Sequence, residues 1–325
     1  MLAERPQLRA RPTRPLPVEP LLLGREPEEA ARLLADVIAL CGGAQACAAR
    51  AAFGLPPRPE DEATRRAEIR RDHLARLLVL WPSRLGFTPA PLPADRLEGG
   101  PQTRQALFGG PPPATGAEML EFLASPRGLA PVFAALAARF AKDEAAVHLP
   151  LVCPASAFHR EARVENSVAA RRAADPALQA VESRHGRGPL WRAVGRLVDL
   201  AAGLDIPAGH AAPPPEGRPD PGAGGVGGRE PGPGSGRSPQ AEPHAGSALV
   251  EAARGLYAVR ACVAGGRVSA FERVTPTDHL TAPGGVLERS LASLGPDAET
   301  KAELLLAILD PCAPVTLESA GPEAP

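Results

Sequence analysis

The hydrophobic positions of this chain recur mostly at helical spacing. The clearest case begins at Pro27, where Leu33, Leu34, Val37 and Ile38 give the following segment one apolar side. Apolar residues three or four positions apart share a face of a helix, and proline suits the first helical turn. The same spacing predicts further helices over residues 61–80, 116–124, 128–141, 166–184, 189–203 and 298–309.

The pattern changes to that of β-strands near the C-terminal end. Two runs, Gly255–Val263 and Arg267–Val274, flank the short segment Ala264-Gly265-Gly266. Two such runs joined by a glycine-containing turn are typical of a β-hairpin. We therefore expect a fold that is mainly α with a small β element, an α+β architecture.

Two consecutive glycines, Gly42 and Gly43, interrupt the first helical pattern. In a helix interior they cost about 2 kcal/mol relative to alanine. Either the helix breaks there, or another backbone or a ligand approaches closely.

Residues 207–246 form the sharpest change in composition, since about half of them are proline or glycine and Val226 is the only large aliphatic residue. Such a segment buries too little apolar surface to offset its conformational entropy. Its glycine run lacks the Gly-Lys-Ser/Thr ending of a phosphate-binding loop. We expect a disordered arm over residues 1–18, a helical part over 19–204, a disordered linker over 205–246, a C-terminal part over 247–318 and a tail over 319–325.

Composition and charge exclude several classes of protein. The net charge of −1 provides no general attraction to nucleic acid or to an anionic membrane. No run of about 18 apolar residues predicts a membrane span, and the first residues lack the apolar core of a secretory signal. The five cysteines are an odd number without the spacing of a disulfide framework. We therefore expect a cytoplasmic protein with reduced thiols and no membrane insertion.

Three stretches carry the motifs of interest. Cys41 and Gly42 lie within residues 20–54, Arg254-Gly255 and Pro276-Thr277 lie within residues 251–294, and Cys312 lies in the phrase LDPCAPVTLE, residues 309–318. In this order they resemble stretches of the catalytic large subunit of nickel–iron hydrogenases, which carries a CGxCxxxH-type motif early in the chain and a DPCxxCxxH-type motif at its end. The resemblance covers roughly residues 18–54 and 247–318.

The departures from these motifs are as informative as the matches. Asp310, Pro311 and Cys312 match the second motif, as Cys41 and Gly42 match the first. The other ligand positions of the two motifs are occupied by Ala44, Ala48, Val315 and Glu318. A shortened, ligand-depleted homologue of this kind is similar to the HupK-type accessory proteins of hydrogenase maturation. The resemblance implies a degenerate large-subunit-like fold in which residues 19–204 and 247–318 pack as one domain and the two cysteine motifs meet.

The resemblance also implies a chemistry. Cys41 and Cys312 correspond to metal ligands, with Cys47 as a further possibility, and thiolates suit iron and nickel. Arg254 and Asp310 correspond to residues beside the cofactor, and a guanidinium can donate hydrogen bonds to cyanide nitrogen. Because both bridging thiolate positions are lost, we expect no catalytic residues and no nickel. An iron that carries cyanide and carbonyl ligands could still be held transiently.

The function implied is that of an accessory scaffold or chaperone, which holds or relays this iron fragment to the large subunit. The implied partners are a HypC-type maturation chaperone, a HypD-type iron-site assembly protein and the large subunit precursor. The alternative is a large-subunit mimic without metal that binds chaperones or shields the immature site from oxygen. A catalytic hydrogenase-like redox enzyme is a third interpretation, against which the missing thiolates argue. For Cys47, Cys153 and Cys262 we favour the role of a small buried hydrophobic residue over a functional one.

Overall fold

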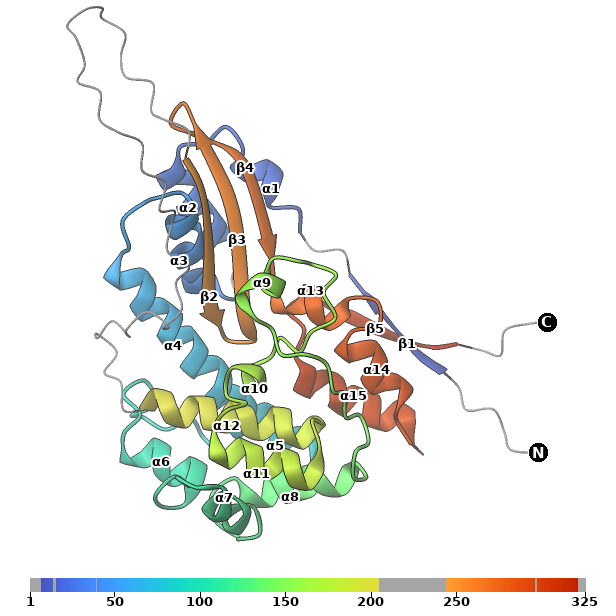
Figure 1. Cartoon of the computed structure of the whole chain (residues 1–325). Helices are drawn as coiled ribbons and strands as arrows, with labels where there is room; N and C mark the ends of the chain where they lie inside the picture. Colours follow the sequence, from blue (N-terminus) through green and yellow to red (C-terminus); the bar gives the residue numbers. More distant parts are fainter. Residues whose placement is uncertain (1–6, 14–15, 39, 205–243, 296, 321–325) are drawn as a thin grey trace, which may run out of the picture.

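The computed structural model describes residues 7–13, 16–38, 40–204, 244–295 and 297–320. Helices predominate, and a three-stranded sheet lies at one end of the molecule (Figure 1). The elements before residue 205 are β1 (Gln7–Pro12), α1 (Glu19–Leu22), α2 (Pro27–Val37), α3 (Gly42–Ala52), α4 (Pro59–Ala75), the π-helix η1 (Arg76–Leu80), α5 (Trp81–Arg84), α6 (Pro101–Phe108), α7 (Gly116–Leu123), α8 (Ala130–Arg139), α9 (Pro154–Ala157), α10 (Val168–Arg171), α11 (Pro176–His185) and α12 (Pro189–Leu204).

The elements after residue 243 form the sheet and the C-terminal helices. They are β2 (His244–Ala252), β3 (Gly255–Ala264), β4 (Arg267–Val274), α13 (Pro276–Thr281), α14 (Val286–Ala292), α15 (Ala298–Leu309) and β5 (Val315–Ala320). The sheet is antiparallel in the order β2-β3-β4, so the expected hairpin is its β3-β4 half. The architecture is α+β, as the hydrophobic pattern predicted.

Two hydrophobic cores hold these elements together. The larger core surrounds α12, and it brings Trp191 and Leu197 of that helix together with Leu305 of α15. The second core lies between α2, α3 and the sheet, where Ala48 packs with Val259 of β3. Both cores therefore combine residues from before and after the segment 205–243 (Figure 1).

The two chain ends depart from the expectation of a disordered arm and tail. Residues 7–12 form β1, which pairs antiparallel with β5, and Arg9 lies opposite Glu318. The expectation of disorder is wrong for these residues, because the stabilising partner lies at the other end of the chain, beyond the reach of a local pattern. Likewise β5 continues to Ala320, into the predicted tail, and β2 begins at His244, within the predicted linker. The rest of that linker, residues 205–243, lies outside the described residues.

The glycine pair marks both a helix start and a close packing of backbones. Helix α2 ends at Val37 and α3 begins at Gly42. A Cβ atom on Gly43 would lie 2.5 Å from the backbone nitrogen of Arg65 in α4. One on Gly42 would lie 2.9 Å from the backbone oxygen of Ala35. The neighbouring backbones of α2 and α4 therefore account for both glycines.

Candidate functional site

A cavity of about 580 Å³ brings together segments from both ends of the chain. Cys41, Arg254 and Cys312 all line it, although they lie far apart in the sequence. Its other walls include Leu16 and Leu40, both more than half exposed at 54% and 52%. The cavity therefore has an apolar border and two thiols in its lining.

Cys41 enters the cavity from the residue that precedes α3. The Nε2 atom of Gln45 donates to its sulfur at 3.5 Å. Burial raises the pKa of the Cys41 thiol, an effect that Cys312 strengthens and Arg254 opposes. The carboxylate of Glu68 accepts the backbone N–H of Gly43 at 3.1 Å, which satisfies the N-terminal turn of α3 beside this cysteine.

Cys312 lies two residues after Asp310, which directly follows α15. The turn that contains both residues has an unusual backbone. Asp310 has φ 54°, a left-handed conformation that few non-glycine residues adopt. The backbone N–H of Cys312 then donates to the Oγ1 atom of Thr277 in α13 at 2.8 Å. The position of the second thiol is thus fixed by α13 as well as by its own turn.

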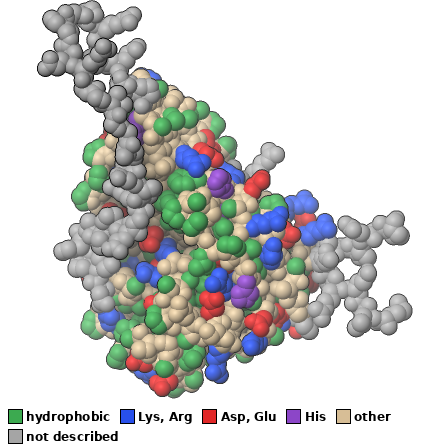
Figure 2. All heavy atoms as spheres, viewed as in Figure 1, with side chains coloured by type: hydrophobic (Ala, Val, Ile, Leu, Met, Phe, Trp, Pro, Cys, Tyr) green, Lys and Arg blue, Asp and Glu red, His purple; other side chains and the backbone are tan. Residues whose placement is uncertain are grey.

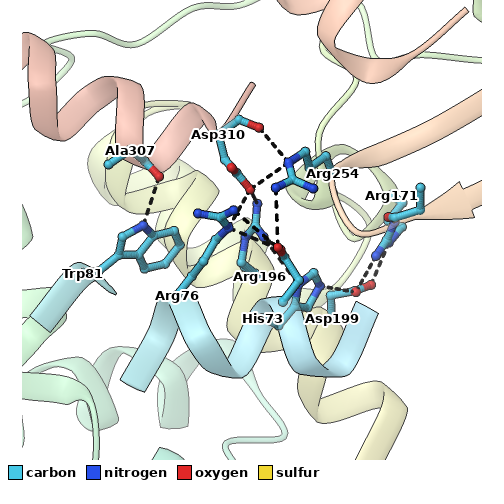
Figure 3. A network of polar contacts seen from close by, with 11 residues as sticks. His73, Arg76, Trp81, Arg171, Arg196, Asp199, Arg254, Ala307 and Asp310 are labelled. Atoms are coloured by element: carbon cyan, nitrogen blue, oxygen red, sulfur yellow. Dashed lines mark hydrogen bonds and ion pairs between the residues drawn. The ribbon is translucent and has the colours of Figure 1, made fainter. Parts of the chain in front are cut away.

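Arg254 and Asp310 join the cavity to a buried cluster of charges (Figure 3). The Nε atom of Arg254 lies 3.1 Å from the Asp310 carboxylate, and Arg76 and Arg196 approach that same carboxylate at 2.6 and 3.2 Å. Arg196 also pairs with Asp72 at 2.6 Å. Three guanidiniums around one carboxylate form strong charge-assisted hydrogen bonds, which hold the turn before Cys312.

A neighbouring part of the cluster is centred on Asp199 of α12. His73 lies 2.9 Å from its carboxylate, and Arg171 and Arg172 pair with it at 2.5 and 2.8 Å. Burial alone would raise the pKa of Asp199, but the Arg171 guanidinium and the His73 hydrogen bond hold it well below its ordinary value. This carboxylate therefore stays charged inside the protein.

The predicted site residues fall into two groups. Cys41, Arg254 and Cys312 meet at one cavity, whereas the side chain of Asp310 lies among the arginines and does not line that cavity. Cys47 does not line it either, because its sulfur points toward α4, where it lies 3.9 Å from the carboxylate of Glu62. Burial raises the pKa of the Cys47 thiol to about 12.

The remaining cysteines differ from the expectation of burial. Cys153 is exposed, because it precedes the short surface helix α9, where a hydrogen bond with Ser156 lowers its pKa. Cys262 is half-buried on β3. For these two residues the prediction of burial is wrong.

Sequence reasoning missed the arginine cluster. Arg76, Arg171 and Arg196 have no motif in common, and their partners lie on other segments. Only the spacing of Asp72 and Arg76, four residues apart on one helical stretch, gave a local signal of a pair. Among the described residues no group of three or more His, Cys, Asp and Glu side chains is placed to hold a metal ion.

The surface carries charges of both signs. Basic and acidic side chains are interspersed on the face seen in Figure 2, in keeping with the net charge of −1. Within the described ranges no helix has the length and apolar character that crossing a membrane requires.

Comparison with known proteins finds a curated relative and several solved structures. No protein-family model matches the chain. The hydrogenase expression/formation protein HupK of Rhodobacter capsulatus is 43% identical over 307 residues, which cover 94% of this chain and 91% of the relative.

The solved structures that match include nickel–iron–selenium hydrogenases. The enzyme of Desulfovibrio vulgaris Hildenborough in its reduced state aligns with a TM-score of 0.57 and 13% identity over 92% of both chains. The same enzyme in its as-isolated oxidised state aligns with a TM-score of 0.54 and 13% identity, over 92% of this chain and 91% of the other. This likeness concerns the fold, and it confirms the expected large-subunit-like architecture.

Proposed function

The chain belongs to the HupK family of hydrogenase expression/formation proteins, and we propose that it acts as an accessory scaffold in the maturation of a nickel–iron hydrogenase. In this proposal it holds the iron fragment that carries cyanide and carbonyl ligands, as cargo, and relays it to the large subunit precursor. The protein itself does not catalyse a hydrogenase reaction.

The observation that carries the proposal is the meeting of Cys41 and Cys312 at one cavity with Arg254. Thiolates are soft ligands suited to iron. Two thiolates, with no third cysteine in the described lining of the cavity, favour reversible binding of the iron fragment over its permanent incorporation. The Arg254 guanidinium is placed to donate hydrogen bonds to an anionic ligand such as cyanide, whose nitrogen accepts them.

The absence of catalysis is inferred from two substitutions. Ala44 and Val315 occupy the positions of the thiolates that bridge nickel and iron in the catalytic subunit. Neither side chain binds a metal, so a binuclear centre lacks its bridges. Purified protein should therefore neither oxidise hydrogen nor reduce protons, and hydrogen-dependent dye reduction with stoichiometric nickel would overturn this part of the proposal.

The partners that fit this role are a HypC-type maturation chaperone, a HypD-type iron-site assembly protein and the large subunit precursor. The apolar border of the cavity, with Leu16 and Leu40 exposed, supports a docking partner near the thiols. Tagged protein taken from its own host should retain at least one of these three, and the pairing should weaken when Leu40 is changed to Lys.

The deciding experiment is an infrared spectrum of protein purified without oxygen from its own host. Bands in the cyanide and carbonyl stretching region, with iron but no nickel by elemental analysis, support the scaffold. A protein that binds maturation chaperones but has no such bands would instead be a mimic without metal, which shields the immature site or competes for its chaperones. The retention of the large-subunit fold over 92% of the chain, with most ligands lost, favours that second candidate.

A further inference from the structure

A second, smaller pocket adjoins the cavity of the two cysteines. Its volume is about 30 Å³, roughly enough for one or two water-sized molecules. Arg254, Pro276 and Thr277 line both spaces and thus form a shared wall. The pocket is otherwise enclosed by α12, the segment around Ser167 and the end of α15.

The lining of this pocket has an excess of positive charge. Three guanidiniums, those of Arg192, Arg196 and Arg254, face two carboxylates, those of Glu165 and Asp310. Arg76 and Asp72 join these residues through Asp310 and Arg196 and add one charge of each sign, and the neighbouring Asp199 is itself paired with two arginines, so no nearby carboxylate among the residues described removes the excess. A positive charge without compensation is costly inside a protein.

Arg192 contributes a hydrogen-bond donor without an acceptor. Its Nη2 and Nε atoms donate to Glu165 at 2.7 and 3.2 Å, and both side chains are at most 3% exposed. The Nη1 atom is also buried, and it has no hydrogen-bond partner within the described part of the chain. A guanidinium carries five N–H donors and no acceptor, so this nitrogen needs an electron-rich neighbour.

Two hydroxyl groups in the lining add further donors. Thr277 accepts the backbone N–H of Cys312 at 2.8 Å, and Ser167 accepts that of Ala170 at 3.3 Å. Each hydroxyl keeps its own hydrogen for a second hydrogen bond. Positive charge and hydrogen-bond donors in the lining of one small pocket are the conditions for binding an anion.

We propose that this pocket binds a small monovalent anion, of halide or diatomic size, between Arg192 and the wall shared with the cysteine cavity. One negative charge offsets the excess among the residues that line the pocket, and the anion accepts the unpaired N–H of Arg192. A water molecule in the same place would accept that N–H but would not balance the positive charge of the arginines. The small volume favours a monatomic or diatomic anion. This inference does not rest on the proposed function, because it requires neither iron nor a partner.

Crystals grown in sodium bromide test the proposal directly. Anomalous scattering at the bromine absorption edge should locate one bromide ion in the pocket, in contact with Nη1 of Arg192. Density of a water molecule without an anomalous signal would overturn the proposal. This measurement uses the unmodified protein, so it does not depend on the folding of any variant.

A solution experiment gives an independent reading. Sodium bromide is exchanged for sodium gluconate at constant ionic strength, and the thermal unfolding midpoint is followed. A bound anion should raise the midpoint steadily with bromide concentration, since a ligand that binds only the native state stabilises it by an amount that grows with the logarithm of the ligand concentration above the dissociation constant. Arg192→Lys keeps a positive charge beside Glu165 but loses the Nη1 donor that would bind the anion. This variant should therefore show no rise in the unfolding midpoint. Arg187→Lys, at a partly exposed arginine that lies over the ring of Trp191 and does not line the pocket, should retain it. Equal midpoints in the two salts would contradict the site.

Discussion

The Nε atom of Arg254 lies 3.0 Å from the backbone oxygen of Asp310 and 3.1 Å from its carboxylate. Arg254 belongs to the turn between β2 and β3, whereas Asp310 ends α15. One side chain therefore fixes both the backbone and the carboxylate of a residue in a left-handed conformation. Since Cys312 follows two residues later, the placement of its thiol depends on an arginine from a distant segment.

The first prediction concerns this contact. Arg254→Lys keeps the charge but loses the planar fork that reaches the backbone oxygen and the carboxylate together. We expect the free energy of unfolding to fall by about 1.5–3 kcal/mol, the range of a hydrogen bond to a charged group. Urea denaturation at neutral pH measures it. Arg84→Lys, at an exposed position of α5, is the matched control and should leave the midpoint unchanged. A loss of equal size in both variants would show that Arg254 has no special structural role.

The second prediction concerns the two cysteines of the cavity. Cys41→Ser and Cys312→Ser keep the size of the side chain but replace a soft ligand with a hard one. Stability should barely change, because neither thiol is fully buried. Activity of the host's hydrogenase should fall, and any cyanide and carbonyl bands of the purified protein should disappear.

The matched control for these variants is Cys262→Ser on β3, a half-buried cysteine that does not line the cavity. It should preserve both the hydrogenase activity and the infrared bands. If both cavity variants also preserve them, the thiols are remnants of an ancestral site, and the mimic without metal becomes the better account.

The motifs and periodicities predicted the helices and the meeting of the cysteines, because both depend on information that the sequence carries locally or through a family resemblance. The predicted helix over 189–203 matches α12 at Pro189–Leu204 closely. The segment 166–184 instead divides into α10 and α11, because Asp175-Pro176 starts a new helix: the Asp175 side chain accepts the N–H of Ala177.

Other features depended on partners that no local pattern identifies. Strand β1 exists through its pairing with β5, and the charge of Asp310 is balanced by arginines from three separate segments. The excess of guanidinium groups around the small pocket has the same origin. Such contacts form only when the chain has folded, so composition and spacing do not predict them.

The third prediction concerns pH. The pKa of Asp199 is depressed in the folded protein, so its carboxylate contributes stability that is complete above its unfolded pKa of about 3.9 and is lost as the pH falls below that value. Asp199→Asn removes the carboxylate that pairs with Arg171 and Arg172, and it should cost about 3–5 kcal/mol at pH 7. The difference from the unmodified protein should shrink as the pH falls below about 4, because Asp199 then takes up a proton in the unfolded chain while the folded carboxylate stays charged.

Urea denaturation of both proteins between neutral and acidic pH checks this. Asp36→Asn, at an exposed position of α2, is the control and should leave the profile unchanged. A difference between Asp199→Asn and the unmodified protein that stays constant with pH would rule out the carboxylate as the titrating group.

The last prediction concerns the close packing beside Cys41. Gly43→Ala places a Cβ atom 2.5 Å from the nitrogen and 2.8 Å from the Cα atom of Arg65, both of them backbone atoms of α4. Because backbone yields less readily than a side chain, α3 and α4 must separate, at a cost of about 1–3 kcal/mol. The separation should also loosen the turn at Cys41 and speed its modification by a maleimide reagent. Gly203→Ala is the matched control: no atom lies within 4 Å of its added Cβ, so it should be neutral or stabilise by up to about 1 kcal/mol. A Gly43→Ala protein as stable as the unmodified one, with an unchanged rate at Cys41, would mean that the helices move apart freely and that the glycine is not required by packing.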